Sequence, residues 1–408
     1  MKYVIIVGDG MADYPVESLG GKTPLMVART PNLDWMAQQG EIGLVRTIPG
    51  GFNPGSEIAN LSIFGYNPIH YYTGRGPLEA ASLGVKLGAD DIAFRCNLVT
   101  LKFNGNKIVM EDFSAGHITN GEAKKVILDL NKALATNEIQ FYPGVSYRHL
   151  MVMKNGAAQF SNLEEPEITP PHDLIGKEIS ALLPKIKEPV LTLMRASQEL
   201  LKNHPVNEAR EAKGLPPANS IWLWGQGRSP QMIPLKERFS IDGYVISAVH
   251  LIKGIGILAG LEVMDVPGIT GYFDTNYDGK AQYTLKGLRE KDFVYVHVEA
   301  PDEASHMGNL RLKIEAIEAF DDKVVGTILD GIKEFKRYKV LVMPDHPTPL
   351  SVRTHTADPV PFVIYSNEGG GGSGHGKTFD EVSAGQSGIF IEKGFELIER
   401  FLAPCCSS

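Results

Sequence analysis

Aspartate and histidine residues cluster at two places in the second half of the chain. The segment MPDHPTPLSVRTHTADPVPFVIY holds one aspartate and two histidines within eleven positions, and the segment PDEASH has an aspartate and a histidine four residues apart. A separation of four places two side chains on the same face of a helical turn. One more aspartate follows the first apolar run of the chain. The six residues are Asp9, Asp302, His306, Asp345, His346 and His355.

Carboxylate and imidazole side chains without cysteine are typical ligands of Mn²⁺, Zn²⁺ or Mg²⁺ at catalytic sites, whereas structural zinc sites favour cysteine. Six protein ligands are more than one catalytic ion usually takes, so the set predicts two divalent metal ions. Each histidine, considered alone, could instead be a hydrogen-bonded loop residue. For the whole set, that alternative needs acidic residues from three separate strand ends to come together by chance.

A serine in the stretch GFNPGSEIANLSIFGY is the candidate nucleophile. Ser56 follows Pro54 and Gly55 in a turn that could expose its hydroxyl, and it precedes the start of a predicted helix. A serine hydroxyl is a weak nucleophile unless a metal ion or a base lowers its pKa, and a helix N-terminus helps to hold a phosphate. The alternative is that Ser56 caps the helix, with Glu57 in its first turn.

Three short apolar runs, KYVIIV, DFVYVHV and YKVLVM, predict the strands that would position these residues. Runs of this length and composition are typical of strands buried in a parallel sheet. Each run is followed by an aspartate. Because ligands gather beyond the carboxyl ends of the strands in an open parallel sheet, we expect Asp9, Asp302 and Asp345 to converge at one edge.

The segments between these strands indicate the fold class. The stretch RLKIEAIEAFDDKVVGTILDGIKEF, residues 311–335, has the apolar spacing of an amphipathic helix. Strands that alternate with helices of this kind predict an α/β protein. At 408 residues the chain is also too long for one ordinary core. We therefore expect a large α/β domain and a second unit.

Composition and charge limit the compartment and the partners. Apolar residues make up 43% and charged residues 22%, which is typical of a soluble protein, and no apolar run is long enough to cross a membrane. The N-terminus has no secretory apolar segment, and Cys96, Cys405 and Cys406 fit a reducing compartment, so a cytoplasmic location is expected. A net charge of −8 argues against nucleic acid as a partner. The sequence does not exclude a homo-oligomer.

Several motifs resemble those of one known family. In order along the chain, Asp9, the GSE of Ser56, PDEASH, PDH and THTADPVPF resemble the metal and nucleophile motifs of the cofactor-independent phosphoglycerate mutases. These enzymes belong to the alkaline phosphatase superfamily. The stretches GKTPLMVARTPNLDWMA, LSIFGY, HPVNEAR and LIKGIG are similar to its archaeal-type branch, and the similarity covers nearly the whole chain.

The resemblance implies a fold and a chemistry. The fold would be an alkaline-phosphatase-like, mostly parallel sheet flanked by helices, with a smaller inserted α+β domain. Ser56 would take the phosphoryl group from 3-phosphoglycerate and return it to the 2-hydroxyl of the same glycerate, without 2,3-bisphosphoglycerate. One ion would be held by Asp302, His306 and His355, and the other by Asp9, Ser56, Asp345 and His346.

Two other functions are open at this point. Where many relatives carry histidine this chain has Asn60, and YTGRGPLEAASLGV and WLWGQG look closer to a bacterial branch proposed to act as homoserine kinase. Such an enzyme would use ATP on the same scaffold. A metal-dependent phosphomonoesterase is the other alternative, and it differs only in whether water reaches the phosphoserine before the acceptor does.

One glycine-rich segment bears on the kinase alternative. Residues 371–378, GGSGHGKT, fit the pattern G-x-x-x-x-G-K-[ST] of a nucleotide-binding loop. A working loop of this kind opens a helix, and the following FDEVSAGQSG is a poor helix former. Only thirty residues follow Thr378. We interpret the segment as a glycine-rich loop without a nucleotide.

The resemblance also implies an inserted domain that closes over the substrate as a lid. A change in sequence character places it at residues 88–188, between 1–87 and 189–408, and KEPVL and NSIWLWG then predict a return to strands. An anionic substrate calls for arginine and lysine side chains. The candidate substrate-binding residues are Arg148, His149, His172 and Asp173 in the insert, and Lys253 and Lys280 after it.

Overall fold

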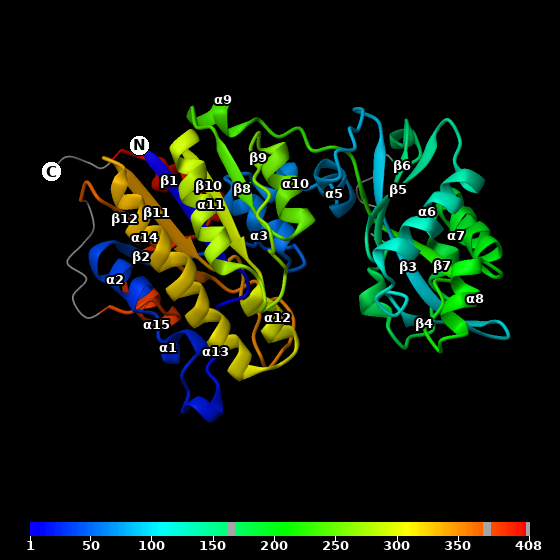
Figure 1. The fold of residues 1–408 in the computed structure, drawn as a ribbon, viewed down its shortest axis with the longest axis horizontal. Coiled ribbons are helices and arrows are strands. Elements are labelled where there is room, and N and C mark those ends of the chain that lie inside the picture. Colours follow the sequence, from blue (N-terminus) through cyan, green and yellow to red (C-terminus); the bar gives the residue numbers. More distant parts are fainter. Residues whose placement is uncertain (161–167, 370–376, 405–408) are drawn as a thin grey trace. The chain divides into compact units, whose positions relative to one another are not determined.

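The computed structural model describes residues 1–160, 168–369 and 377–404, and the chain divides into two compact units (Figure 1). Unit 1 comprises Met1–Tyr72 and Gln231–Ser408, and unit 2 comprises Thr73–Pro230. The expected insert of residues 88–188 therefore lies inside unit 2, which extends beyond it at both ends.

Unit 1 is built on an eight-stranded sheet. Only β12 runs antiparallel to its neighbours, so the prediction of a mostly parallel α/β sheet is confirmed. The three strands predicted from apolar runs, β11, β1 and β10, lie side by side at its centre. The order is β13 (Phe390–Ile391), β2 (Glu41–Val45), β12 (Val360–Ser366), β11 (Tyr338–Met343), β1 (Lys2–Gly8), β10 (Phe293–Val298), β8 (Gly243–Ile246) and β9 (Glu262–Val263).

Helices cover both faces of this sheet, which explains why the central strands are apolar throughout. On one face, Val4, Val294 and Val340 share a core with four helices, α2 (Pro31–Gln39), α11 (Tyr277–Glu290), α13 (Leu310–Ala319) and α14 (Thr327–Gly331). Figure 1 shows α13 and α14 lying over this face. On the other face, Tyr295 of β10 stacks on Phe64 at the end of α3, with ring centroids 4.0 Å apart.

The long helix predicted for residues 311–335 forms, but it changes its winding along its length. It comprises α13 (Leu310–Ala319), a π-helical segment (Phe320–Gly326), α14 (Thr327–Gly331) and a 3₁₀ turn (Ile332–Glu334). In the π segment the buried Asp321 carboxylate accepts hydrogen bonds from the backbone N–H groups of Asn32 and Leu33. The segment therefore satisfies free N–H groups at the start of α2.

Unit 2 is an antiparallel sheet with helices packed against it. Its long strand β3 (Ile92–Asn104) pairs with β4 (Lys107–Asp112), β6 (Arg148–Met153) and β7 (Ser220–Gly227), and β6 pairs with β5 (Ile139–Val145). Its helices are α5 (Arg75–Ser82), α6 (Asn120–Leu134), α7 (Glu188–Leu201) and α8 (Pro205–Glu211).

The wider boundaries of unit 2 follow from its core. Strand β7 pairs with β3 from Ala93 to Val99, so NSIWLWG does form a strand, but one that belongs to unit 2. The segment KEPVL, which we expected to be strand-like, instead begins α7, and Val190 and Met194 of this helix share a core with Trp222 of β7. The sequence could not show this, because the pairing joins segments far apart in the chain.

The glycine-rich segment lies mostly outside the described residues, as do Cys405 and Cys406. After it, the Asp380 side chain accepts a hydrogen bond from the Ser383 N–H and begins α15 (Glu381–Gln386), so a short helix forms in the stretch expected to be a poor helix former. Cys96 is buried on β3, and burial raises the pKa of its thiol. No helix in the described ranges is long and apolar enough to span a bilayer. The remaining helices are α1 (Pro24–Val27), α4 (Pro68–Tyr71), α9 (Leu235–Phe239), α10 (His250–Leu258), α12 (Ala300–His306) and α16 (Leu397–Leu402).

A buried ion pair joins the loops that follow β1 and β11. Lys313 of α13 is fully buried, and its Nζ lies 2.8 Å from Asp13 Oδ2, 3.3 Å from the Ala12 carbonyl oxygen and 3.0 Å from the Thr348 carbonyl oxygen. The Asp13 carboxylate also accepts from the Leu350 N–H. Removing one partner would leave a charge buried without compensation.

We expect Lys313→Met to lower the free energy of unfolding by about 3 kcal/mol. Urea denaturation followed by circular dichroism measures this change. The matched control is Arg311→Met on the same helix, because Arg311 is exposed and pairs with Glu315 at 2.7 Å. The control should lower the free energy of unfolding far less, because an exposed ion pair contributes little to stability. Equal losses in the two variants would contradict the role given to the buried pair.

Candidate active site

The structure brings the three predicted aspartates together at the carboxyl edge of the central strands. Asp9 directly follows β1, Asp345 follows β11, and Asp302 lies in α12, which follows β10. All three side chains are buried. His346 Nε2 lies 3.5 Å both from Asp9 Oδ1 and from Asp345 Oδ2, and His355 Nε2 lies 3.6 Å from Asp302 Oδ1.

The ligand atoms fall into two groups that meet near His346. In the first, His306 Nε2 lies 3.0 Å from Asp302 Oδ2 and 3.2 Å from His355 Nε2. Asp9, Asp345 and His346 form the second group, and their ligand atoms all lie within 4.8 Å of one another. His346 is also within this distance of Asp302 and His355, so its imidazole stands between the two groups.

The electrostatics of the cluster favour bound cations. Burial and the charges of Asp345 and Asp302 raise the pKa of Asp9 well above its ordinary value. Burial would lower the pKa of His306, but the Asp302 carboxylate raises it to about 9. Asp9 Oδ1 is buried and has no hydrogen-bond partner among the described residues. A carboxylate oxygen in this situation fits a metal ligand, and the donor set of carboxylates and imidazoles fits divalent ions.

A glycine allows the first loop to reach the cluster. Gly10 has a φ of 63°, and a Cβ atom there would lie 2.5 Å from Asp302 Oδ1 and 2.7 Å from Thr348 Oγ1. Its N–H donates to Asp345 Oδ1 at 3.2 Å. Any side chain at this position would displace the cluster, so the turn requires glycine.

Ser56 is the first residue of α3 (Ser56–Ile63), and its hydroxyl faces the cluster. Its Oγ lies 3.1 Å from His346 Nε2. The N-cap of the helix is Gly55, and no side chain caps it. The capping alternative for Ser56 is therefore not supported, and its hydroxyl stands at a helix N-terminus, where a phosphate would be favoured.

Sequence reasoning mentioned Asn60 only as a departure from the family and gave it no role. Its side-chain amide donates to the Ser56 carbonyl oxygen at 2.8 Å and to Asp345 Oδ2 at 2.9 Å, and its Oδ1 accepts from the Tyr295 hydroxyl. Asn60 thus ties the helix that carries the serine to a carboxylate of the cluster. The available signal was its spacing of four from Ser56, which places both residues on one helical face.

Two further residues of the cluster were missed. Thr348 donates from Oγ1 to Asp302 Oδ1 at 2.5 Å and lies 3.2 Å from His346 Nδ1. His297, the penultimate residue of β10, lies 3.3 Å from Asp9 Oδ2 through its Nε2. His297 follows Tyr295 by two positions, so both side chains point to the same face of the sheet.

The two lysines expected to bind substrate make contacts within the protein. Lys253 lies on α10, with its Nζ 3.3 Å from Asp265 Oδ1. Lys280, on α11 (Tyr277–Glu290), is fully buried, and its Nζ donates to the His297 carbonyl oxygen at 2.8 Å. Burial lowers the pKa of Lys280 to about 8. Substrate binding by either lysine stays a prediction.

The four candidates in unit 2 differ in exposure. Arg148 is exposed, with its guanidinium 5.2 Å from the centre of the Tyr147 ring. His149 is buried, its Nδ1 accepts from the Gly144 N–H at 3.0 Å, and burial lowers its pKa to about 3. His149 therefore lies within the sheet, and substrate binding by His149 stays a prediction. In the 3₁₀ turn Pro171–Leu174, His172 and Asp173 are both exposed, and His172 Nε2 lies 3.8 Å from Asp173 Oδ1.

Two arginines that sequence reasoning missed lie beside Trp224 in unit 2. The guanidinium of Arg95 lies 4.5 Å and that of Arg75 5.8 Å from the Trp224 ring centre. Burial lowers the pKa of Arg95 to about 10, opposed by Glu79 and reinforced by Arg75 and Arg148. The charges of Arg75 and Arg148 therefore both act on Arg95, and Glu79 is the nearby acid. Such a cluster suits an anionic ligand.

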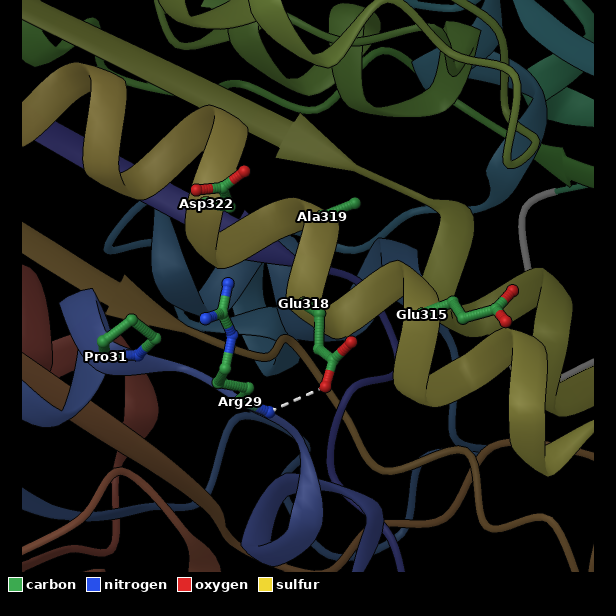
Figure 2. A pocket seen from close by; sticks show the side chains of 6 residues that line it. All are labelled: Arg29, Pro31, Glu315, Glu318, Ala319 and Asp322. Atoms are coloured by element: carbon green, nitrogen blue, oxygen red, sulfur yellow. Dashed lines mark hydrogen bonds between the residues drawn. The ribbon is translucent and has the colours of Figure 1, made fainter.

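A surface pocket of about 280 Å³ lies elsewhere in unit 1 (Figure 2). Three of its lining side chains are acidic, and the Arg29 backbone N–H donates to Glu318 Oε1 at 2.9 Å. None of the six aspartates and histidines of the cluster lines it, so it is separate from the candidate active site. The lining residues are Arg29, Pro31, Glu315, Glu318, Ala319 and Asp322.

A mostly parallel α/β sheet with buried carboxylates and imidazoles at its carboxyl edge defines the class of this protein, an α/β protein with a candidate metal-binding site. The family model for 2,3-bisphosphoglycerate-independent phosphoglycerate mutase matches residues 37–207. A Geobacter sulfurreducens protein named as a probable enzyme of this kind is 52% identical over 98% of this chain and 100% of its own length. A Methanosarcina acetivorans protein of the same name is 50% identical over 98% of both chains.

Solved structures agree with these matches. The PH0037 protein of Pyrococcus horikoshii matches with a TM-score of 0.81 and 29% identity, covering 98% of this chain and 96% of its own. The cofactor-independent phosphoglycerate mutase of Thermoplasma acidophilum matches with a TM-score of 0.62 and 25% identity, covering 98% and 99%. The chain belongs to the 2,3-bisphosphoglycerate-independent phosphoglycerate mutases, which are isomerases. The family expected from the motifs is confirmed, and the homoserine kinase alternative is not favoured.

Proposed function

We propose that this protein interconverts 3-phosphoglycerate and 2-phosphoglycerate through a phosphoserine at Ser56, with two divalent metal ions. One observation carries the proposal: the Ser56 hydroxyl lies 3.1 Å from His346 Nε2, at a helix N-terminus beside the buried carboxylates. Thr348 also places a hydroxyl in the cluster, but that hydroxyl donates to Asp302 Oδ1.

The proposed ligands follow the two groups of side chains. When bound, the ions lower the pKa of the serine hydroxyl and neutralise charge on the transferring phosphoryl group. His346 Nε2 faces Ser56, Asp9 and Asp345, which favours assigning it to the second group. The first ion would be held by Asp302, His306 and His355, and the second by Asp9, Ser56, Asp345 and His346.

The reaction proceeds in two balanced transfers. In the first, Ser56 Oγ forms a bond to phosphorus while the bond between phosphorus and the C3 oxygen breaks; the serine loses a proton and the C3 oxygen gains one. In the second, the C2 hydroxyl oxygen forms a bond to phosphorus and loses its proton, while the bond between phosphorus and Ser56 Oγ breaks and Ser56 Oγ regains a proton. No nucleotide and no bisphosphorylated cofactor is consumed. Exclusion of water during the phosphoserine stage distinguishes this enzyme from a phosphomonoesterase.

The arginine cluster of unit 2 is proposed to bind the substrate anion. A phosphoglycerate carries up to three negative charges, and guanidinium groups form paired hydrogen bonds with carboxylate and phosphate. Arg148 is exposed, whereas Arg95 is buried, with its Nε 3.1 Å from Glu79 Oε2. Arg148 is therefore the member best placed to exchange water for a ligand.

Replacing the nucleophile tests the mechanism. Ser56→Ala should lower kcat by a factor on the order of 10³ or more while changing the melting temperature little, because the hydroxyl caps no helix. Mass spectrometry of wild type after brief exposure to 3-phosphoglycerate should find a phosphate on the peptide that contains Ser56. The matched control is Ser62→Ala in the same helix, whose turnover should stay near that of wild type. Phosphate on a histidine would show that the mechanism is wrong.

Metal removal is the second test of the proposal. Dialysis against EDTA should abolish mutase activity, and added Mn²⁺ should restore it, because the buried carboxylates need cations to act. Assays with 3-phosphoglycerate, with ATP and homoserine, and with a generic phosphomonoester would separate the three activities. Full activity in excess EDTA after dialysis would exclude the two-ion function.

The anion site is tested at Arg148. Arg148→Ala should lower kcat/KM for 3-phosphoglycerate by roughly 10- to 100-fold through loss of a charged hydrogen-bonding partner, with unchanged metal content. Lys154→Ala, an exposed residue just after β6, makes the same change in charge and should have little effect. Wild-type kcat/KM in the Arg148 variant would remove this residue from the substrate site.

A further inference from the structure

We propose that His297 is a positioning residue for the metal pair, acting through the second oxygen of Asp9. The proposal rests on the two-ion function given above. None of the sequence motifs that point to the metal ligands includes His297, which lies within the apolar run of β10. The evidence is its burial, its unpaired ring nitrogens and its place beside Asp9.

The imidazole of His297 is sealed inside the protein without a hydrogen-bond partner. The residue is 1% exposed, and neither of its ring nitrogens makes a hydrogen bond to the described residues. A buried polar group without a hydrogen-bond partner lowers the stability of the folded state, so its presence calls for a specific explanation. A neutral imidazole has one N–H to donate.

The nearest polar atoms to this ring belong to the metal cluster. His297 Nε2 lies 3.3 Å from Asp9 Oδ2 and 3.9 Å from Asp345 Oδ2. The other Asp9 oxygen, Oδ1, lies 3.5 Å from His346 Nε2 and has no hydrogen-bond partner among the described residues. The carboxylate therefore directs one oxygen to His297 and the other to the proposed ligand set. An N–H from His297 would fix that orientation.

The backbone around His297 is held firmly. Its carbonyl oxygen accepts a hydrogen bond from the buried Lys280 Nζ at 2.8 Å, and the Asp9 N–H donates to the carbonyl oxygen of Val298 at 2.9 Å. The ring and the carboxylate are thus carried by adjacent strands that are themselves hydrogen-bonded. Lys280 therefore helps to fix the backbone of His297 through this hydrogen bond.

A shape-matched pair of variants tests the proposal. His297→Gln keeps an N–H donor near the position of Nε2. His297→Met introduces a side chain of nearly the same shape as glutamine but without a donor. His149→Gln is the control, because His149 is the buried histidine of unit 2 with an unpaired Nε2. Metal-stripped wild type and variants are titrated with Mn²⁺ by calorimetry, and the melting temperature of each is measured.

Wild type should bind two Mn²⁺ ions. Groups that orient metal ligands typically contribute 10- to 100-fold in affinity, so His297→Met should weaken one of the two sites by that factor. His297→Gln should recover a substantial part of the loss, and His149→Gln should bind as wild type does. Wild-type affinity at both sites in His297→Met would overturn the role of His297 alone. Absence of Mn²⁺ binding by wild type would overturn the two-ion function, and this proposal with it.

Two further measurements keep the result interpretable. If His297→Met does not fold, His297→Phe replaces it, because it fills the same space with a ring that has no nitrogen. Pulsed electron paramagnetic resonance of bound Mn²⁺ counts the coupled imidazole nitrogens. The count should be the same in wild type and His297→Gln. Loss of one nitrogen coupling in His297→Gln would mean that His297 is itself a ligand, and the positioning role would be wrong.

Discussion

Three carboxylates buried at one edge of a sheet are the constraint on which the rest of this structure depends. Two unit charges 4 Å apart interact by about 4 kcal/mol at the effective dielectric of a protein, so the negative charges of Asp9, Asp302 and Asp345 destabilise one another unless cations lie nearby. Burial and the neighbouring carboxylates raise the pKa of Asp9, and the Asp302 carboxylate raises the pKa of His306 against the effect of burial. Histidine side chains offset part of this repulsion, and divalent metal ions would offset the rest. A parallel sheet creates the problem, because it brings three strand ends to one place.

The same constraint explains the polar contacts around the cluster. Gly10 lets a backbone N–H reach Asp345, Asn60 donates an amide N–H to the same carboxylate, and Thr348 donates to Asp302. Each contact satisfies a carboxylate oxygen and joins a different element to the strand ends. Lys313 hydrogen-bonds both to the loop that follows β1 and to the loop that follows β11. Within unit 2, the charges of Arg75 and Arg148 act on the buried Arg95, and this arginine cluster is the one that we propose for the substrate anion.

Sequence alone predicted the parts of the site that depend on local pattern. The strand ends carrying the three aspartates follow from apolar runs, and Ser56 follows from a turn before a helix. The arginines beside Trp224 were out of reach, because α5, β3 and β7 meet only through long-range pairing. The same pairing explains why unit 2 extends beyond the predicted insert of residues 88–188. A substrate role was predicted for Lys280 from its charge. The sequence could not show that this side chain is buried, because burial depends on the tertiary packing.

Strand β10 shows where a site can be read more closely from sequence. Its residues alternate between two faces: Val294, Val296 and Val298 pack into the core shared with α11 and α13, whereas Tyr295 faces α3. His297 occupies this second face one step nearer the carboxyl end, beside Asp9. Taken as a whole, the sequence of this strand looks uniformly apolar. When its alternate positions are considered separately, one face becomes polar towards the carboxyl end of the strand, where the candidate site lies. A parallel strand whose two faces differ in this way carries information about the site before its terminal loop begins.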